Sequence, residues 1–461
     1  MSGAESGLTA QLVAFATGIG FANLPQLAID RAKASITDAV GCMLAGVHSE
    51  ESRATYAFAL AEGGAPVSRM CGRVARTSPS LAALVNGATG HALDFDDSSP
   101  PMIGHPSVVL VATLFALGDR LGSSGKDILT AYVAGLEAGA RLGRHMNPSH
   151  YNAGWHATVT LGTMAAVTAA SKLIGLDARQ FNSAIGIAAS SAAGIRKNFG
   201  SGVKPLHAGF AARNGVVAAL LAQSGMTAND ASLEGQTGFL DVFGGDQKAD
   251  ASSIRFSLDQ ELEIIASGIG LKPYPCCGCT HAAIDAALEI RARHKISADD
   301  VAAIECAQNS FAPGVLVYHR PDTPSQAKFS MEHCLAVAIA DGDCGLDQFA
   351  AARVADAKLK DLAARVTTRV DETFEYRNGI YPATVTVIMR SGERLSHHVV
   401  EATGQSDRPL SPEQLLRKFS GCAARSLPEA QWRSAFSGLQ ALEFCNDIRL
   451  VTKTLGVDHN G

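Results

Sequence analysis

The chain has 461 residues, of which 47% are hydrophobic, 18% charged and 6% aromatic, and its formal net charge is −5. This length suggests two or three domains with a large core, and the acidic balance argues against nucleic acid or an anionic membrane as a partner. Ten cysteines in so long a chain do not indicate a disulfide framework, which favours a reducing, cytoplasmic setting.

The first ~265 residues read as helices, because hydrophobic residues recur there at helical spacing and we find no convincing alternating strand pattern. Asn23 is a plausible N-cap and Pro25 lies in the first turn of the first of these helices. The expected helices cover 24–47, 81–88, 107–121, 126–142, 158–174, 180–195 and 207–223. No hydrophobic run reaches the ~18 residues that cross a bilayer, and the N-terminus lacks the basic start of a signal peptide.

The pattern changes after about residue 268. Residues 301–308 are rich in β-branched and small hydrophobic residues, and 383–390 alternate before Ser391-Gly392, which predicts a hairpin with 394–400. Helices are expected between these strands, over 280–293 and 329–340. From about residue 411 the chain returns to helix, with Pro412 near a start and 423–439 amphipathic. The chain is therefore predicted to be mainly α, with an α+β segment inserted into or appended to a helical domain.

An acidic stretch over residues 91–107 lies between two of the hydrophobic helices. It carries Asp94, Asp96, Asp97 and His105, and its three prolines keep most of it from being helical. Such a loop is costly unless its polar groups are paired or used. A functional site and a solvated, helix-capping loop both fit this stretch on its own.

Two further stretches each precede a predicted helix. His150, Trp155 and His156 come before a helix of small residues and suit a polar pocket at its N-terminus, which favours anions; a cap with a buried Trp is the alternative. Residues 196–207 are basic, but Gly200 and Gly202 lack the spacing of a phosphate-binding loop. A loop that binds a carboxylate fits them better, with a solvated surface loop as the alternative.

Metal binding is disfavoured by the spacing of the candidate ligands. Cys276, Cys277 and Cys279 have no second Cys-x-x-Cys to complete a zinc site, so their loop is better read as presenting His281 at a helix start. A calcium loop starting at Asp94 would need Gly and Glu where Ser99 and His105 stand. An Asp-Asp-x-x-Asp cluster would need Asp at position 100, which is Pro. Histidines and lysines without a metal indicate proton transfer on an anionic substrate.

Taken together, these stretches resemble the MmgE/PrpD family, which includes 2-methylcitrate dehydratase, cis-aconitate decarboxylase and iminodisuccinate epimerase. Six short motifs in the right order carry the resemblance: Asp94-Phe95-Asp96-Asp97, His105-Pro106-Ser107, Gly154-Trp155-His156, Lys204-Pro205-Leu206-His207, Lys272-Pro273-Tyr274-Pro275 and Ala327-Lys328-Phe329-Ser330. The resemblance implies a large helical domain built from both chain ends (1–267 and 406–461), a smaller α+β lid domain (268–405) and a homodimer. It also implies catalysis without metal or organic cofactor, in a cleft between the domains.

The resemblance also implies roles for individual residues. The expected catalytic residues are Asp94, His105, His156, Lys204, His281 and Tyr151, and the expected substrate-binding residues are Lys197, His207, Lys272 and Tyr318. His156 or His105 would be the base and the other the acid, with Asp94 orienting a histidine. Lys204 and Lys272 would supply positive charge for substrate carboxylates. His281, brought in by lid closure, would deliver a proton or bind a carboxylate.

The reactions of the family share one step, the formation of a carbanion next to a carboxylate, and they differ in what leaves. We therefore expect a cofactor-independent lyase, a dehydratase or decarboxylase, that acts on a small di- or tricarboxylate. An epimerase of an iminodisuccinate-like dicarboxylate is the first alternative, since residues 98–105 and 151–156 look closer to that branch. A non-catalytic, polycarboxylate-binding dimer is the second.

Overall fold

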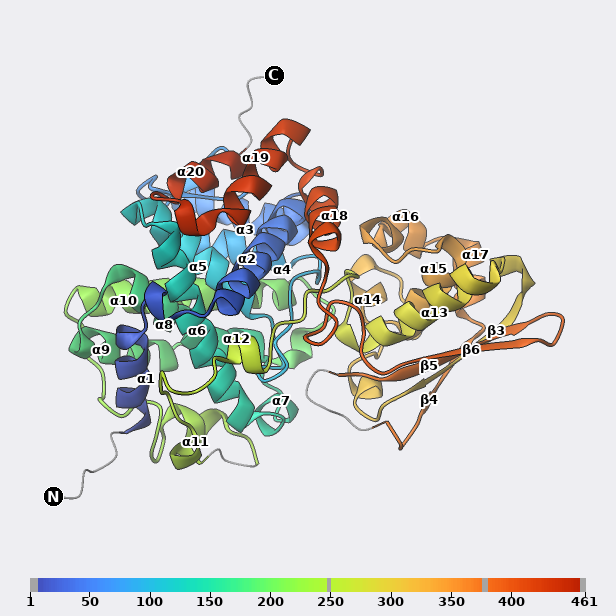
Figure 1. Cartoon of the computed structure of the whole chain (residues 1–461), viewed down its shortest axis with the longest axis horizontal. Helices are drawn as coiled ribbons and strands as arrows, with labels where there is room; N and C mark the ends of the chain where they lie inside the picture. Colours follow the sequence, from blue (N-terminus) through green and yellow to red (C-terminus); the bar gives the residue numbers. More distant parts are fainter. Residues whose placement is uncertain (1–6, 247–249, 375–379, 457–461) are drawn as a thin grey trace. The chain divides into compact units, whose positions relative to one another are not determined.

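The computed structural model describes residues 7–246, 250–374 and 380–456, and the chain divides into two compact units. Unit 1 comprises Met1–Ile269 and Pro412–Gly461, and unit 2 comprises Gly270–Ser411. The sequence predicts these two boundaries after residue 267 and after residue 405, whereas the units divide after Ile269 and after Ser411. The first and the last described helices both belong to unit 1, where α18 (Pro412–Ala423) packs on α2 (Gln26–Gly46) (Figure 1).

Unit 1 is built from helices that pack on one another. Besides α2 and α18 they are α1 (Leu8–Gly18), α3 (Glu50–Glu62), α4 (Pro79–His91), α5 (Pro106–Leu121), α6 (Gly125–Met146), α7 (Ser149–Asn152), α8 (Ala157–Ile174), α9 (Ala178–Ala189), α10 (Val203–Gln223), α11 (Phe239–Phe243), α12 (Glu263–Ala266), α19 (Glu429–Gln440) and α20 (Arg449–Thr452). Local signals set several starts: Ser124 with Asp127, and Asp177 with Gln180, form capping boxes at α6 and α9.

Several predicted elements of unit 1 need correction. The helix expected over 180–195 ends at Ala189, and Ile195 instead forms an isolated bridge with Trp155. The first expected helix begins at Gln26 with Pro25 as its N-cap, and Asn23 lies in a short 3₁₀ turn. The structure also contains α1, α3 and a two-residue antiparallel pair, β1 (Ser68–Arg69) with β2 (Arg76–Thr77), none of which is among the predicted elements. Strands of two residues are too short for an alternating pattern to be visible.

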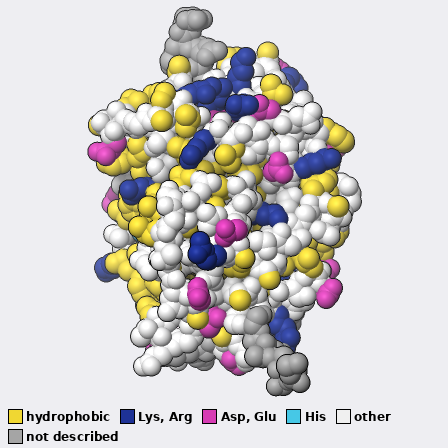
Figure 2. All heavy atoms as spheres, turned by 90° about the vertical axis from the view of Figure 1, so that its left-hand side faces the viewer, with side chains coloured by type: hydrophobic (Ala, Val, Ile, Leu, Met, Phe, Trp, Pro, Cys, Tyr) yellow, Lys and Arg dark blue, Asp and Glu magenta, His cyan; other side chains and the backbone are white. Residues whose placement is uncertain are grey.

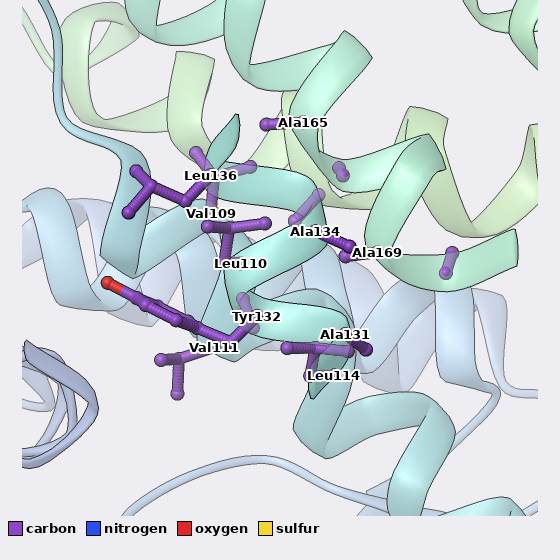
Figure 3. Close-up of a cluster of buried hydrophobic side chains, with 14 of the residues drawn as sticks. Val109, Leu110, Val111, Leu114, Ala131, Tyr132, Ala134, Leu136, Ala165 and Ala169 are labelled. Carbon is purple, nitrogen blue, oxygen red and sulfur yellow. The ribbon is translucent and has the colours of Figure 1, made fainter. Parts of the chain in front are cut away.

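Part of the hydrophobic core of unit 1 is a cluster of buried residues from α5, α6 and α8, shown in Figure 3. Small residues let these helices approach closely: a Cβ added at Gly135 of α6 would lie 2.6 Å from the carbonyl oxygen of Ala165 in α8. A side chain at this position would force the two helices apart. The low aromatic content of the sequence therefore corresponds to tight packing of helix backbones.

Helix α8 is the only described helix that is long and hydrophobic enough to cross a membrane by length and composition, which corrects the expectation that no hydrophobic run reaches that length. However, 83% of its residues are buried inside the protein. The helix is the kind that forms the core of a globular domain, where every face meets other helices. On the face of the molecule drawn in Figure 2, acidic and basic side chains are interspersed among hydrophobic and other groups.

Unit 2 contains a four-stranded mixed sheet in the order β4-β3-β5-β6. The strands are β3 (Val301–Gln308), β4 (Val366–Val370), β5 (Ala383–Met389) and β6 (Arg394–Val399), and β4 runs parallel to β3 while the other pairs are antiparallel. The hairpin predicted around Ser391-Gly392 is present, with Ile388 opposite Arg394. Strand β4, which begins with one buried residue and then turns polar, carries no such pattern and was not predicted.

The helices of unit 2 are α13 (His281–His294), α14 (Pro324–Ala327), α15 (Met331–Asp341), α16 (Ala351–Val354) and α17 (Ala357–Ala363). Helix α13 packs on α15 and on strands β5 and β6. The predicted fold class, mainly α with an α+β second part, is confirmed.

Candidate active site

The acidic loop connects α4 to α5 in unit 1 and is held against the start of α8. Its backbone folds back on itself through a bridge between Ser99 and Gly104. A Cβ added at Gly104 would lie 3.0 Å from the backbone nitrogen of Thr158, closer than most Cβ contacts, so glycine favours this approach. The next residue, His105, donates its backbone N–H to the Thr158 hydroxyl at 3.2 Å. The loop and the N-terminus of α8 thus form one polar region.

His91, the last residue of α4, is paired with a carboxylate of the loop. Its Nδ1 lies 2.9 Å from both oxygens of Asp96, and both side chains are fully buried. A carboxylate only accepts hydrogen bonds, so Nδ1 carries the proton. Nε2 of His91 is buried without a hydrogen-bond partner among the described residues. The pair therefore fixes the tautomer of the ring and leaves Nε2 as the nitrogen that can exchange a proton.

His105 is oriented by the backbone of the same loop. Its Nδ1 donates to the carbonyl oxygen of Asp97 at 2.5 Å, which leaves Nε2 as the second exchangeable position. That nitrogen lies 3.9 Å from Oδ1 of Asp94. The rings of His91 and His105 lie 4.5 Å apart, centre to centre. Two imidazoles with assigned tautomers thus stand next to each other.

Lys204, in the first turn of α10, forms an ion pair with Asp94. Its Nζ lies 2.9 Å from Asp94 Oδ1 and 5.5 Å from the ring centre of Phe199. Both charged side chains are largely buried, with 8% and 6% of their surfaces exposed. Asp94 has a φ of 53°, a left-handed conformation that aspartate tolerates better than most residues. The loop backbone is thus shaped so that this carboxylate meets the lysine.

His156 and His207 form a second imidazole pair. Their Nδ1 atoms lie 2.9 Å apart, so one of them donates a hydrogen bond to the other. Burial lowers the pKa of His156 well below its ordinary value, and the neighbouring imidazoles and Lys204 lower it further. Burial, His91 and Lys204 lower the pKa of His207 to about 4. Both rings are therefore neutral near pH 7, and His156 lies 6.1 Å from His91, centre to centre.

Two further sets of contacts fix the acidic loop to the rest of unit 1. Asp97 accepts hydrogen bonds from the backbone N–H and the hydroxyl of Ser107, and that hydroxyl lies 2.5 Å from the phenol oxygen of Tyr132 in the core. Burial raises the pKa of Asp97 well above its ordinary value. On the other side, Lys418 of α18 lies 2.6 Å from Asp38 and donates to the carbonyl of Phe95 at 2.7 Å. The C-terminal segment thus braces the loop.

The loop also brings together residues of a kind that bind metals. Ligand atoms of His91, Asp94, Asp96 and His105 all lie within 4.8 Å of one another. However, the ammonium group of Lys204 lies 2.9 Å from Asp94 and already supplies positive charge there. A divalent cation at this cluster would be repelled by that ammonium group. These four side chains therefore fit a site in which histidines transfer protons better than a site that binds a metal.

The other predicted site residues lie in different places. Tyr151 of unit 1 is buried beneath Arg196, whose guanidinium carbon lies 3.8 Å from its ring centre, whereas Lys197 is exposed on the neighbouring 3₁₀ turn. His281, Lys272 and Tyr318 belong to unit 2; the first two are buried and Tyr318 is half-buried. Nε2 of His281 donates to the carbonyl of Cys276 at 3.2 Å. The roles of these residues stay predictions.

The sequence motifs do not single out His91 or indicate a role for Asp96. The only signal available was the spacing of five residues between them, with His91 at the end of a helix and Asp96 in the loop that follows. That spacing does not by itself bring two side chains together, because it depends on where the helix ends.

Comparisons with known proteins agree with this architecture. Residues 10–252 match the model of the MmgE/PrpD N-terminal domain and residues 274–440 that of the MmgE/PrpD C-terminal domain. A cis-aconitate decarboxylase from Aspergillus terreus is 27% identical over 476 residues, covering 97% of this chain and 95% of the relative. The mouse cis-aconitate decarboxylase is 27% identical over 93% of this chain and 89% of its own length, and the human protein is 26% identical over 95% and 92%. The predicted resemblance is confirmed, and the chain belongs to the MmgE/PrpD family.

Proposed function

We propose that this protein is a lyase that removes CO₂ from a tricarboxylate such as cis-aconitate, without a metal or an organic cofactor. One observation carries the proposal: His91, His105, His156 and His207 converge with Lys204 inside unit 1. The similarity to cis-aconitate decarboxylases along nearly the whole chain supports the choice of substrate. We extend the proposal to a homodimer, as the family resemblance implies.

The proposed reaction breaks one carbon–carbon bond and forms one carbon–hydrogen bond. The bond to one carboxylate breaks, CO₂ leaves, and the electron pair moves through the neighbouring double bond to a carbon next to a remaining carboxylate. A protonated histidine then donates a proton to that carbon, and solvent returns a proton to the enzyme. The protein must therefore supply a proton donor and stabilise negative charge, which imidazoles and a lysine are suited to do.

We assign these tasks from the hydrogen bonds of each ring. His91 and His105 have Nδ1 committed to Asp96 and to the Asp97 carbonyl, so each would exchange its proton at Nε2. His156, held neutral by burial beside His207, would donate a hydrogen bond to a carboxylate rather than a full positive charge. Lys204 would attract a carboxylate while keeping its bond to Asp94.

The test is to incubate the purified protein in D₂O with cis-aconitate and to follow the products by NMR. We expect one CO₂ released and one deuterium incorporated per product molecule, and no turnover in His156→Ala. The exposed histidine His294, at the end of α13, offers a control variant, His294→Asn, that should keep full activity. Release of water without CO₂ would reject the decarboxylase in favour of a dehydratase.

The same experiment separates the other two readings. An epimerase would exchange deuterium into an iminodisuccinate-like dicarboxylate without losing any group. A dimer that only binds the acid would show saturable binding with neither exchange nor product.

A separate experiment tests the metal-free mechanism. If activity disappeared on dialysis against a chelator and returned with a divalent cation, the cluster of His91, Asp94, Asp96 and His105 would be a metal site, and the metal-free mechanism would be wrong.

A further inference from the structure

Three cysteines of unit 2 converge, although Cys276 lies far from Cys334 and Cys344 in the sequence. The Sγ atoms of Cys276, Cys334 and Cys344 all lie within 4.8 Å of one another. Each of the three side chains is fully buried, with 0% exposure. This grouping differs from the one that the sequence suggests, since Cys277 and Cys279, the neighbours of Cys276 in the chain, are not part of it.

The three thiols come from separate, firmly held segments. Cys276 precedes α13, Cys334 lies in the first turns of α15, and Cys344 follows Gly342, which ends α15 in a left-handed conformation. Helices α13 and α15 pack on each other, which brings the segments together. Because all three positions are fixed by the packing of unit 2 itself, the cluster exists without rearrangement of the chain.

We infer that Cys276, Cys334 and Cys344 form a binding site for a soft thiophilic metal ion, Cu(I), held by three sulfur atoms. Three sulfurs in one plane around an ion, each at a bond length of about 2.3 Å, lie ~4 Å apart. The observed limit of 4.8 Å leaves only a small contraction to reach that geometry. Thiolate ligands select Cu(I) over the hard cations, and a structural zinc ion would need a fourth ligand.

The hydrogen bonds around Cys276 indicate which group donates before a metal is bound. The hydroxyl of Thr280 donates to the carbonyl of Cys277 at 2.8 Å, so the Cys276 thiol, 3.1 Å from that hydroxyl oxygen, is the donor between them. Binding one Cu(I) ion to three thiols releases three protons and leaves a complex with two negative charges. The positive N-terminal ends of α13 and α15 flank Cys276 and Cys334 and would offset part of that charge.

The site has a direct neighbour with a predicted role. His281, the first residue of α13, donates from Nε2 to the backbone carbonyl of Cys276. A metal bound to Cys276 would therefore hold fixed the segment that carries His281. The metal site itself does not depend on the proposed function, because its test measures metal binding and not turnover.

The test titrates the reduced, full-length protein with Cu(I) held by the coloured competitor bicinchoninate, under anaerobic conditions. We expect the wild type to withdraw one equivalent of Cu(I), and Cys334→Ala and Cys344→Ala each to weaken binding at least tenfold. Cys306→Ala is the matched control, since Cys306 lies in β3 of the same unit and is equally buried. It should bind like the wild type. No uptake by the wild type, or unchanged binding in both cluster variants, would overturn the inference.

A second measurement needs no variant and so does not depend on whether the variants fold. X-ray absorption at the copper edge of the loaded wild type should give three sulfur neighbours at about 2.3 Å. Two sulfurs, or nitrogen in place of sulfur, would reject the three-thiolate site. In a parallel titration, Zn(II) should fail to displace Cu(I); displacement by an equal concentration of Zn(II) would show that the site is not selective for the softer ion.

Discussion

Nδ1 of His91 lies 2.9 Å from both carboxylate oxygens of Asp96, and neither side chain reaches solvent. The pair joins the last residue of a helix to the loop that follows it, and it leaves Nε2 of the ring as the only position that can exchange a proton. This relationship makes His91 a candidate for proton transfer that the motifs of the sequence do not reveal.

The first prediction concerns this pair. His91→Asn keeps a donor for Asp96 but removes Nε2, so kcat should fall by about 10²- to 10⁴-fold, the usual contribution of a general acid or base. Asp96→Asn should have a similar effect, because an amide no longer fixes the tautomer of the ring. Steady-state kinetics and thermal unfolding of both variants check this. Full activity in His91→Asn would remove the ring from the mechanism.

The second prediction concerns Lys204, which lies 2.9 Å from Asp94. Lys204→Met should raise KM by about 10- to 100-fold, since a hydrogen bond to a charged group contributes about 1.5–3 kcal/mol. Lys204→Arg keeps the charge and should recover part of the binding. Lys453→Ala, at an exposed position of unit 1, is the control and should leave KM unchanged. Equal KM values for Lys204→Met and the wild type would refute the role of Lys204 in substrate binding.

The third prediction follows from the lowered pKa values of His156 and His207. Between the ordinary value of about 6.5 and the value of about 4 in the folded protein, the unfolded chain binds a proton on His207 that the folded chain does not. Protonation of this ring therefore does not lower the free energy of unfolding above pH 6.5. As the pH falls from 6.5 towards 4, the free energy of unfolding decreases by roughly 1–3 kcal/mol.

Urea unfolding at pH 7.5 and at pH 5 measures this loss. Asp97 has a raised pKa and acts in the opposite direction, so the wild type alone does not isolate the histidine. The comparison with His207→Gln does, because this variant should lose less stability than the wild type between the two pH values. An identical loss in both proteins would contradict the assignment.

The fourth prediction concerns Lys418, which lies 2.6 Å from Asp38 with both side chains buried. Burial alone would lower the pKa of Lys418, but the neighbouring carboxylate raises it, so the pair is charged. Lys418→Met leaves a buried carboxylate without its partner and should cost about 3–5 kcal/mol of unfolding free energy. The double variant Asp38→Leu with Lys418→Met should recover most of this cost in a denaturant titration. Equal stability of the single variant and the wild type would show that the pair is not structural.

Much of the fold follows from local patterns. Helical spacing and capping residues are properties of short segments, so α5, α6 and α8 were predicted to within a few residues. The β5–β6 hairpin was equally visible, because its alternation and its Ser391-Gly392 turn are consecutive. Strand β4 was not, since it is short, mostly polar and paired in parallel with a strand far away in the sequence.

The sequence by itself determined the family, the order of helical and mixed segments, and most residues of the candidate site, because these are read from motifs and periodicity along the chain. Only the tertiary structure decided that His91 joins Asp96, that His156 meets His207, and that Cys276 groups with Cys334 and Cys344 rather than with Cys277. The physical reason is that side-chain chemistry depends on distances through space. Those distances are set by where helices end and how they pack, which no single stretch of sequence specifies.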